Sequence, residues 1–185
     1  MQDFRDLDRQ QWHQRYVAQA GWTAHIRKYI FNKIKPAEDV HILEVGSGTG
    51  AVIGALLNQG YANITGLDLD FPSLDYTKAI QPTFHLVLGD GHRLPFPKAW
   101  FGITFCHYLL MWTAHPSTIL SEMCRVTQPG GWVLALAESD HRARIDYPDQ
   151  LAVLGHHQTQ SLEAQGADVS LGRKLRSLFI DTGLM

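Results

Sequence analysis

Three carboxylates stand where strands would end, and a glycine-rich loop accompanies the first of them. Glu44 comes two residues before the loop 46–50, Asp68 lies 20 residues beyond Gly48, and Asp90 follows a third apolar run. A glycine loop lets a ligand approach the backbone, and the start of a helix directs amide N–H groups toward it. An acid about 20 residues further on is placed to bind ribose hydroxyls. The pattern therefore predicts a site for a nucleoside-containing ligand.

The loop spacing alone leaves two ligand classes open. Gly46, Gly48 and Ala51 satisfy the dinucleotide pattern G-x-G-x-x-G/A. An acid beside a pyrophosphate is unfavourable, however, and Glu44 suits a ligand that carries an ammonium group or another positive charge. Asp90 adds an acceptor for an exocyclic amine. Each acid also has a purely structural interpretation. Glu44 could stabilise the dipole of the helix that follows, and Asp68 and Asp90 could be solvated loop acids.

The elements expected to position these residues alternate between short apolar strands and helices. Strands are expected over residues 40–45, 64–69, 84–88, 101–106 and 132–137. Helices are expected over residues 8–34 in two segments meeting near Gly21, and over 51–58, 71–79, 116–126, 148–165 and 172–181. This alternation predicts an α/β fold, an open and mainly parallel sheet with helices on both faces. Such sheets bind ligands at the carboxyl ends of their strands.

Composition narrows the class of protein further. The 185 residues are 45% hydrophobic and 18% charged, with a net charge of −2, which suits one domain and recommends no nucleic-acid partner. The N-terminal residues Met1–Asp6 lack the apolar stretch of a signal peptide, and no run is long enough for a transmembrane helix. Cys106 and Cys124 are expected to be reduced thiols. We therefore expect a cytoplasmic protein without a membrane partner.

Four segments resemble the motifs of the class I S-adenosylmethionine-dependent methyltransferases. They are residues 42–50 (ILEVGSGTG), 65–68 (TGLD), 89–96 (GDG followed by LPF) and 125–132 (RVTQPGGW). The flanking residues are similar, more loosely, to the small-molecule, ubiquinone-biosynthesis-like (methyltransferase type 11) branch. The resemblance implies a Rossmann-like fold that binds S-adenosyl-L-methionine, methylates a small-molecule acceptor at O, C or N, and releases S-adenosyl-L-homocysteine.

The resemblance also implies roles at the methionine and ribose parts of the cofactor. Gly46, Ser47 and Gly48 would approach the methionine part, and Glu44 would orient its amino group. Asp68 would accept hydrogen bonds from both ribose hydroxyls.

The remaining implied positions lie at the adenine and at the acceptor side. Leu69 would pack on adenine, Asp90 would accept from the adenine amine, and the Gly91 amide would serve a ring nitrogen. His107 follows the fourth strand, where the family's acceptor side faces the cofactor. It is expected to line the pocket and is the one candidate for a catalytic base, with a packing histidine as the alternative.

Several expectations concern what surrounds this site. No metal is expected, because His141, His156 and His157 lack the spacing of metal ligands. The chain is read as a single domain over residues 1–185, with a helical cap over 1–36 and a cap of the acceptor pocket over 139–170. The aromatic residues of the first cap are expected to be core or part of a lid over the cofactor: Trp12, Tyr16, Trp22 and Tyr29.

The family sheet normally has seven strands, and only five are expected here. An artificially truncated chain, a naturally short gene or an edge completed by a partner would each explain this. Without the last two strands, the wholly apolar run Trp132–Ala137, typical of a strand covered on both faces, becomes an exposed edge that invites a homodimer. Two other functions stay open: a shortened binding module without activity, and a nucleotide-dependent oxidoreductase, which Glu44 disfavours.

Overall fold

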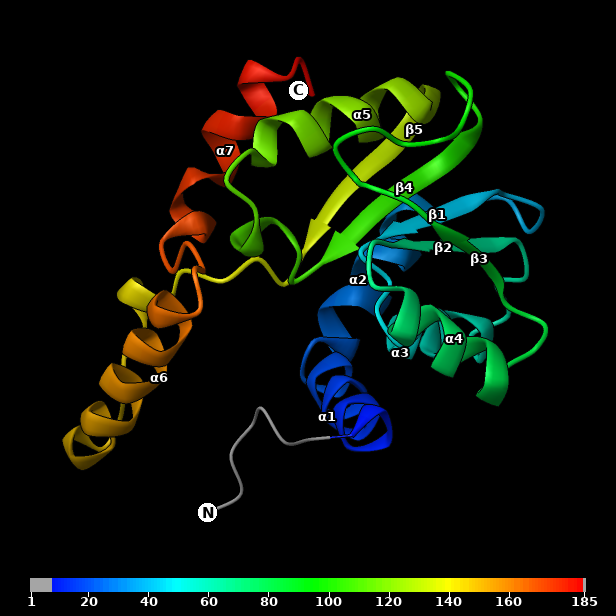
Figure 1. Cartoon of the computed structure of the whole chain (residues 1–185). Helices are drawn as coiled ribbons and strands as arrows, with labels where there is room; N and C mark the ends of the chain where they lie inside the picture. Colours follow the sequence, from blue (N-terminus) through cyan, green and yellow to red (C-terminus); the bar gives the residue numbers. More distant parts are fainter. Residues whose placement is uncertain (1–7, 185) are drawn as a thin grey trace.

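The computed structural model describes residues 8–184, which fold around a five-stranded parallel sheet (Figure 1). The strand order is β3-β2-β1-β4-β5, and every neighbouring pair is parallel. The strands are β1 (Ile42–Val45), β2 (Ile64–Asp68), β3 (His85–Leu88), β4 (Phe101–His107) and β5 (Thr127–Leu136). The order reverses between β1 and β4, which is where open α/β sheets form their ligand crevice.

Helices cover both faces of this sheet, which confirms the predicted α/β class. They are α1 (Arg9–Trp22), α2 (Ala24–Ile34), α3 (Ala51–Leu57), α4 (Phe71–Ile80), α5 (Pro116–Val126), α6 (Ala152–Ala164) and α7 (Leu171–Asp181). In Figure 1, α5 and α7 lie above the sheet and α1 to α4 below it, whereas α6 stands apart. The two N-terminal helices meet at Thr23, close to the predicted junction.

Two hydrophobic clusters show how the strands divide their side chains between the faces. Leu43 and Val45 of β1 point into a cluster with α5 and α7. Ile42, one residue out of phase, points into the second cluster with Phe31 of α2 and with α3. Because side chains alternate along a strand, Glu44 shares the face of Ile42. Its carboxylate is therefore directed toward the N-terminal helices.

The strand β5 begins earlier than the sequence predicted. It was expected to begin at Trp132, but Pro129–Gly131 already lie inside β5, which starts directly after α5. The register shifts between Phe101 and Ile103, and Gly130 has a φ of 80°. A bulge of this kind accommodates proline and glycine at the edge of a sheet.

The outer side of β5 pairs with no strand among residues 8–184, so β5 is an edge strand, as expected. Both faces of its apolar run are packed, as expected: Val133 and Ala135 contact the cluster with α5 and α7, and Leu134 and Leu136 contact the other cluster. Trp132 at the start of the run is the exception, at 48% exposed. At the other end, the expectation about Met1–Asp6 lies outside the described residues. No helix within residues 8–184 combines the length and apolarity that crossing a membrane requires.

Candidate functional site

The loop after β1 turns through glycines whose backbone conformation other residues rarely adopt. Gly46 and Gly48 have φ angles of 76° and 51°. A Cβ atom on Gly46 would lie 2.8 Å from Leu109 Cδ1, so a side chain there would collide with the segment after β4. The Gly46 and Ser47 amides donate to the Leu67 carbonyl, at 2.8 and 3.0 Å. These bonds fix the loop against β2, and α3 starts immediately after it.

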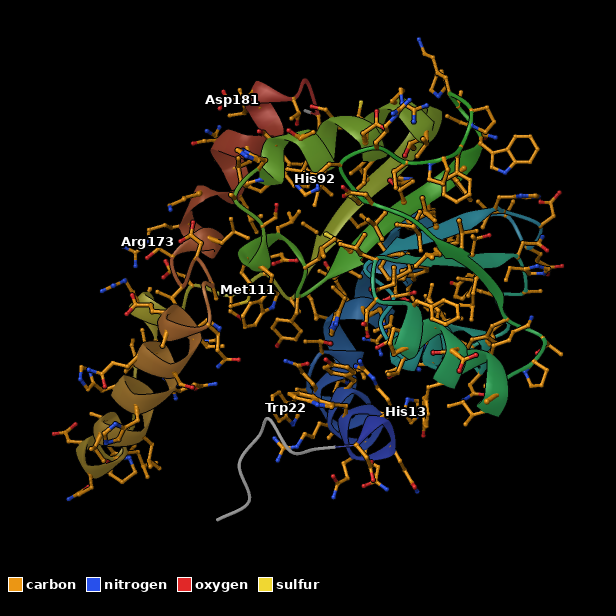
Figure 2. The ribbon with its side chains drawn as sticks, in the orientation of Figure 1. His13, Trp22, His92, Met111, Arg173 and Asp181 are labelled. Carbon is orange, nitrogen blue, oxygen red and sulfur yellow. The ribbon has the colours of Figure 1, made fainter. Side chains whose placement is uncertain are left out.

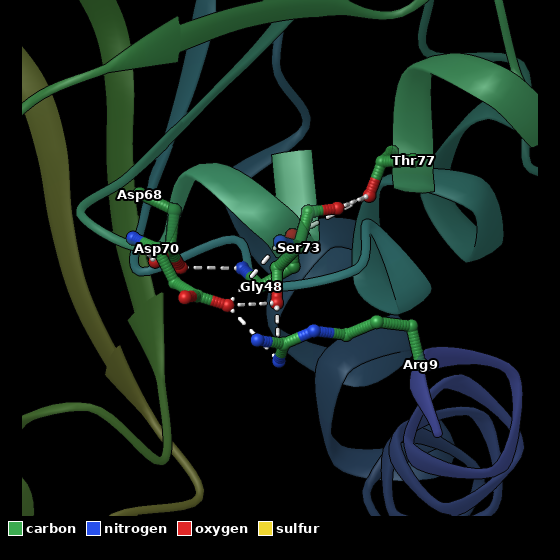
Figure 3. Close-up of polar contacts among 6 residues, drawn as sticks. All are labelled: Arg9, Gly48, Asp68, Asp70, Ser73 and Thr77. Carbon is green, nitrogen blue, oxygen red and sulfur yellow. Dashed lines mark hydrogen bonds and ion pairs between the residues drawn. The ribbon is translucent and has the colours of Figure 1, made fainter. Parts of the chain in front are cut away.

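Asp68 ends β2 directly beside this loop (Figure 3). Its Oδ2 accepts a hydrogen bond from the Gly48 amide at 2.6 Å, and its Oδ1 accepts from the Asp70 amide at 2.8 Å. The two bonds orient the carboxylate and still leave lone pairs on both oxygens. The predicted acid and the predicted glycine loop are therefore brought together.

A second polar network joins the first turn of α1 to the start of α4 (Figure 3). Arg9 Nη1 lies 3.0 Å from Asp70 Oδ2, and Asp70 Oδ2 also accepts from Ser73 Oγ at 2.6 Å. Thr77 Oγ1 donates to the Ser73 carbonyl at 2.8 Å and reaches the Gly48 carbonyl at 3.4 Å. This network anchors the N-terminal helix beside the glycine loop.

A cavity of about 360 Å³ opens at the carboxyl ends of β1, β2 and β3. This size lies within the range of small-ligand sites, roughly 300–1,000 Å³. The predicted site residues that line it are Gly46, Asp68, Leu69, Asp90 and Gly91. His92 follows on the β3 side, and the other wall comes from α5 and the segment after β4, through Leu109, Trp112, Thr113, Ala114, His115 and Ile119. Leu69 is 71% exposed, which leaves its side chain free to cover a planar ring.

His92, labelled in Figure 2, was not singled out from the sequence and connects the segment after β3 to the segment after β4. Asp90 Oδ1 lies 2.7 Å from His92 Nδ1 and accepts from the His92 amide at 2.9 Å. His92 Nε2 lies 2.8 Å from Thr113 Oγ1. The His92 contacts hold the pKa of the Asp90 carboxyl below its usual value. Asp90 is thus ionised at neutral pH and held facing the cavity.

Glu44 and Ser47 are buried at the glycine loop, and we call these two residues the floor of the loop. The buried Arg27 lies near Glu44. Glu44 is 2% exposed, and burial raises its pKa well above the ordinary carboxyl value, an effect that the nearby charge of Arg27 opposes. Arg27 of α2 is 1% exposed, and burial lowers its pKa. Glu44 Oε2 and Ser47 Oγ are buried without a hydrogen-bond partner among the described residues. Neither Glu44 nor Ser47 lines the cavity, although Val45 and Gly46 between them do.

His107 ends β4 and faces the N-terminal helices. Its Nε2 lies 2.8 Å from Thr23 Oγ1, and His107 is not among the residues that line the cavity. Burial, with a smaller contribution from the charge of Arg27, lowers its pKa to about 4. The imidazole is therefore neutral at physiological pH, and its place in the structure couples β4 to the junction of α1 and α2.

Glu138 is a second residue that the sequence reasoning missed. It is 7% exposed, and its Oε1 accepts hydrogen bonds from the Leu109 and Leu110 amides at 2.8 and 3.1 Å. Oε2 accepts more weakly from the Met111 amide at 3.4 Å. These bonds cap the 3₁₀ turn Leu110–Trp112, whose segment forms a wall of the cavity. The signal was available, because Glu138 lies near the carboxyl end of a strand, as the other three acids do.

No group of three His, Cys, Asp or Glu side chains that could hold a metal ion occurs between residues 8 and 184.

Comparisons with known proteins identify the family of this chain. A family model described as a methyltransferase domain matches residues 43–135, which is 93 of 185 residues and contains the glycine loop, Asp68 and Asp90. The chain belongs to the methyltransferase domain family. It has the class I fold of S-adenosylmethionine-dependent methyltransferases, and S-adenosylmethionine is the cofactor of this class. The membership leaves the oxidoreductase alternative without support.

Two curated relatives illustrate the sequence similarity. The malonyl-[acyl-carrier protein] O-methyltransferase of Serratia marcescens is 34% identical over 93 residues, which are 50% of this chain and 36% of the relative. The demethylmenaquinone methyltransferase of Renibacterium salmoninarum is 29% identical over 125 residues, 68% of this chain and 52% of the relative. The chain thus spans between about a third and a half of the length of these relatives.

Solved structures support the fold. A Bacillus halodurans protein described as a methyltransferase superposes with a TM-score of 0.65 at 19% identity, over 84% of this chain and 67% of that one. A SAM-dependent methyltransferase from Methanosarcina mazei superposes with a TM-score of 0.51 at 24% identity, over 57% of this chain and 55% of that one.

Proposed function

We propose that this protein transfers a methyl group from S-adenosylmethionine to an oxygen, carbon or nitrogen atom of a small-molecule acceptor. The observation that carries the proposal is the 360 Å³ cavity, where the glycine loop, Asp68 and Asp90 converge in a chain of this family. The two relatives above are named for different acceptors, malonyl-[acyl-carrier protein] and demethylmenaquinone. The reaction type is common to both relatives, whereas the acceptor differs between them.

The residues of the cavity fit the adenosine part of the cofactor. Asp68, oriented by the Gly48 and Asp70 amides, accepts from the ribose hydroxyls with its remaining lone pairs. Leu69 covers one face of the adenine. Asp90, held by His92, accepts from the exocyclic amine, and the Gly91 amide donates to a ring nitrogen.

The floor of the glycine loop fits the methionine part. Glu44 presents a buried oxygen without a partner, and an ammonium group would supply the missing donors and favour the ionised carboxylate. Ser47 Oγ is a second unpartnered group on the same floor. S-adenosylmethionine supplies an electrophilic methyl group on its sulfonium. The contribution of the protein is then mainly to align an acceptor atom with that methyl group.

The N-terminal helices are proposed to cap the cofactor. His13 Nδ1 of α1 lies 2.9 Å from Thr49 Oγ1 in the glycine loop. Tyr16 Cε2 lies 3.9 Å from the position that a Cβ atom on Gly48 would occupy. Burial raises the pKa of the Tyr16 hydroxyl, and the nearby Asp68 and Asp70 add to this increase. The segment 139–170 is proposed to cap the acceptor side, where it adjoins the turn Leu110–Trp112 through a hydrogen bond from the Asp168 amide to the Met111 carbonyl at 2.7 Å.

Calorimetric titration with S-adenosylhomocysteine and with NAD tests the cofactor. We expect binding of the first and none of the second. Asp68→Ala removes an acceptor of two charge-assisted hydrogen bonds, each worth about 1.5–3 kcal/mol, so the affinity should fall roughly 100-fold or more. Asp75→Ala, which removes an exposed acid of α4 outside the cavity, is the matched control. Unchanged affinity in Asp68→Ala would refute the ribose role.

Turnover across a panel of small acceptors tests the activity itself. Methylated product with any acceptor, detected by mass spectrometry, supports the proposal. Tight binding of S-adenosylhomocysteine without turnover of any acceptor would instead favour a binding module that lacks activity.

A further inference from the structure

Three buried side-chain nitrogen or oxygen atoms lack a hydrogen-bond partner within residues 8–184, and two of them belong to the floor of the glycine loop. Two are Glu44 Oε2 and Ser47 Oγ, which the proposed function assigns to the methionine part of the cofactor. The third is Nε of Arg27, which comes from α2, outside the matched family segment 43–135. Buried polar groups are normally paired, so each such atom requires an explanation.

Arg27 is a buried side chain that forms no ion pair with another residue between positions 8 and 184. Both hydrogen bonds that it makes to described residues come from Nη1, to the Ala20 carbonyl and to Thr23 Oγ1, each at 3.2 Å. Glu44 is close enough for the two charges to affect each other's pKa. No carboxylate of the described residues lies within 4 Å of the Arg27 guanidinium. A buried charge of this kind is costly unless a partner compensates it.

The amino-acid end of S-adenosylmethionine carries both an ammonium and a carboxylate. Glu44 matches the ammonium, and we propose that Arg27 binds the carboxylate. The inference rests on the proposed function, because it completes the same cofactor site. Since Nη1 is held by α1 and Thr23, the Nε–Nη2 edge of the guanidinium is the edge left for a planar carboxylate, which it can bind through two parallel hydrogen bonds.

Three ligands distinguish the contribution of the ammonium group to binding from that of the carboxylate. S-adenosylhomocysteine carries the ammonium and the carboxylate, its decarboxylated analogue carries the ammonium alone, and 5′-methylthioadenosine carries neither. Calorimetry on the full chain should show that the wild type prefers S-adenosylhomocysteine to the decarboxylated analogue by at least tenfold. Arg27→Met should abolish this preference and leave the affinity for 5′-methylthioadenosine within twofold. Lys28→Met, which removes an exposed cation of the same helix, should change none of the three affinities.

Two further variants distinguish ligand binding from a structural role. Arg27→Lys keeps the charge without the planar fork and should retain part of the preference. Glu44→Gln should weaken both ammonium-bearing ligands and spare 5′-methylthioadenosine.

Three results would overturn the inference. Equal binding of S-adenosylhomocysteine and its decarboxylated analogue by the wild type would do so without any variant. A uniform loss of all three ligands in Arg27→Met and Arg27→Lys would show that Arg27 only supports the fold. Failure of the wild type to bind any of the three ligands would remove the proposed function, and the inference with it.

Discussion

Replacement of Glu138 by alanine should weaken both the fold and the cofactor site. The carboxylate is buried and holds the amides of Leu109 and Leu110 at 2.8 and 3.1 Å, with a weaker contact to Met111 at 3.4 Å. The variant would leave two well-formed amide donors without an acceptor. Because this segment provides Leu109, Trp112 and Thr113 to the cavity wall, its distortion should also reduce ligand affinity.

The expected magnitude follows from the two lost bonds. Each buried donor left unpaired costs about 1–3 kcal/mol, and the carboxylate itself was disfavoured by burial, which raises its pKa. Two unpaired donors would together cost about 2–6 kcal/mol. We expect a loss in the lower half of this range, about 3 kcal/mol in the free energy of unfolding. For a chain of this size, that corresponds to a decrease of roughly 6–12 °C in Tm.

Chemical denaturation, thermal denaturation and S-adenosylhomocysteine titration together measure this effect. Glu138→Gln keeps one acceptor oxygen and should lose about 1 kcal/mol. Glu163→Ala is the control, because this α6 acid forms only a surface ion pair with Arg142 and its loss should cost less than about 0.5 kcal/mol. A Glu138→Ala protein within 1 kcal/mol of the wild type would refute the capping role.

Three further predictions concern pH and association. The folded pKa of Glu44 is raised above its ordinary value of 4.5, so the free energy of unfolding should fall as pH rises from about 4.5 through that raised value. Denaturation at a series of pH values should show this decline flattened in Glu44→Gln; an identical slope would contradict it. Because the pKa of His107 is lowered to about 4, its titration should cause no step near pH 6.5 in the pH–rate profile. A step that disappears in His107→Gln would show that the imidazole titrates normally. The exposed edge of β5 predicts self-association in sedimentation, which Trp132→Lys should reduce; a wild type that stays monomeric at high concentration would count against it.

The sequence predicted the elements well where an apolar run ends at a clear signal. The helix Pro116–Val126 has the expected bounds because a proline opens it and its buried residues recur at helical spacing. The start of β5 was missed because a proline and two glycines are typical of a turn, and only the pairing with β4 reveals that a bulge absorbs them.

The candidate site divides in the same way. Glu44, Asp68 and Asp90 could be predicted from the sequence because the ends of parallel strands meet at one edge of the sheet. Arg27 was not predicted, although it lies four residues after Thr23 and four before the buried Phe31, so that it shares the inward stripe of α2. The contacts of His92 depend on side-chain conformations that spacing alone does not specify.

The isolation of α6 has a consequence for the dynamics of the chain. Gly155 is its one buried residue, and Leu162 is its contact with the core cluster next to α5 and α7. A helix that buries so little can open at a small cost in free energy while the sheet stays folded. Its amide hydrogens should therefore exchange with solvent long before those of β1 and β4, and a protease should cut within residues 152–164 first.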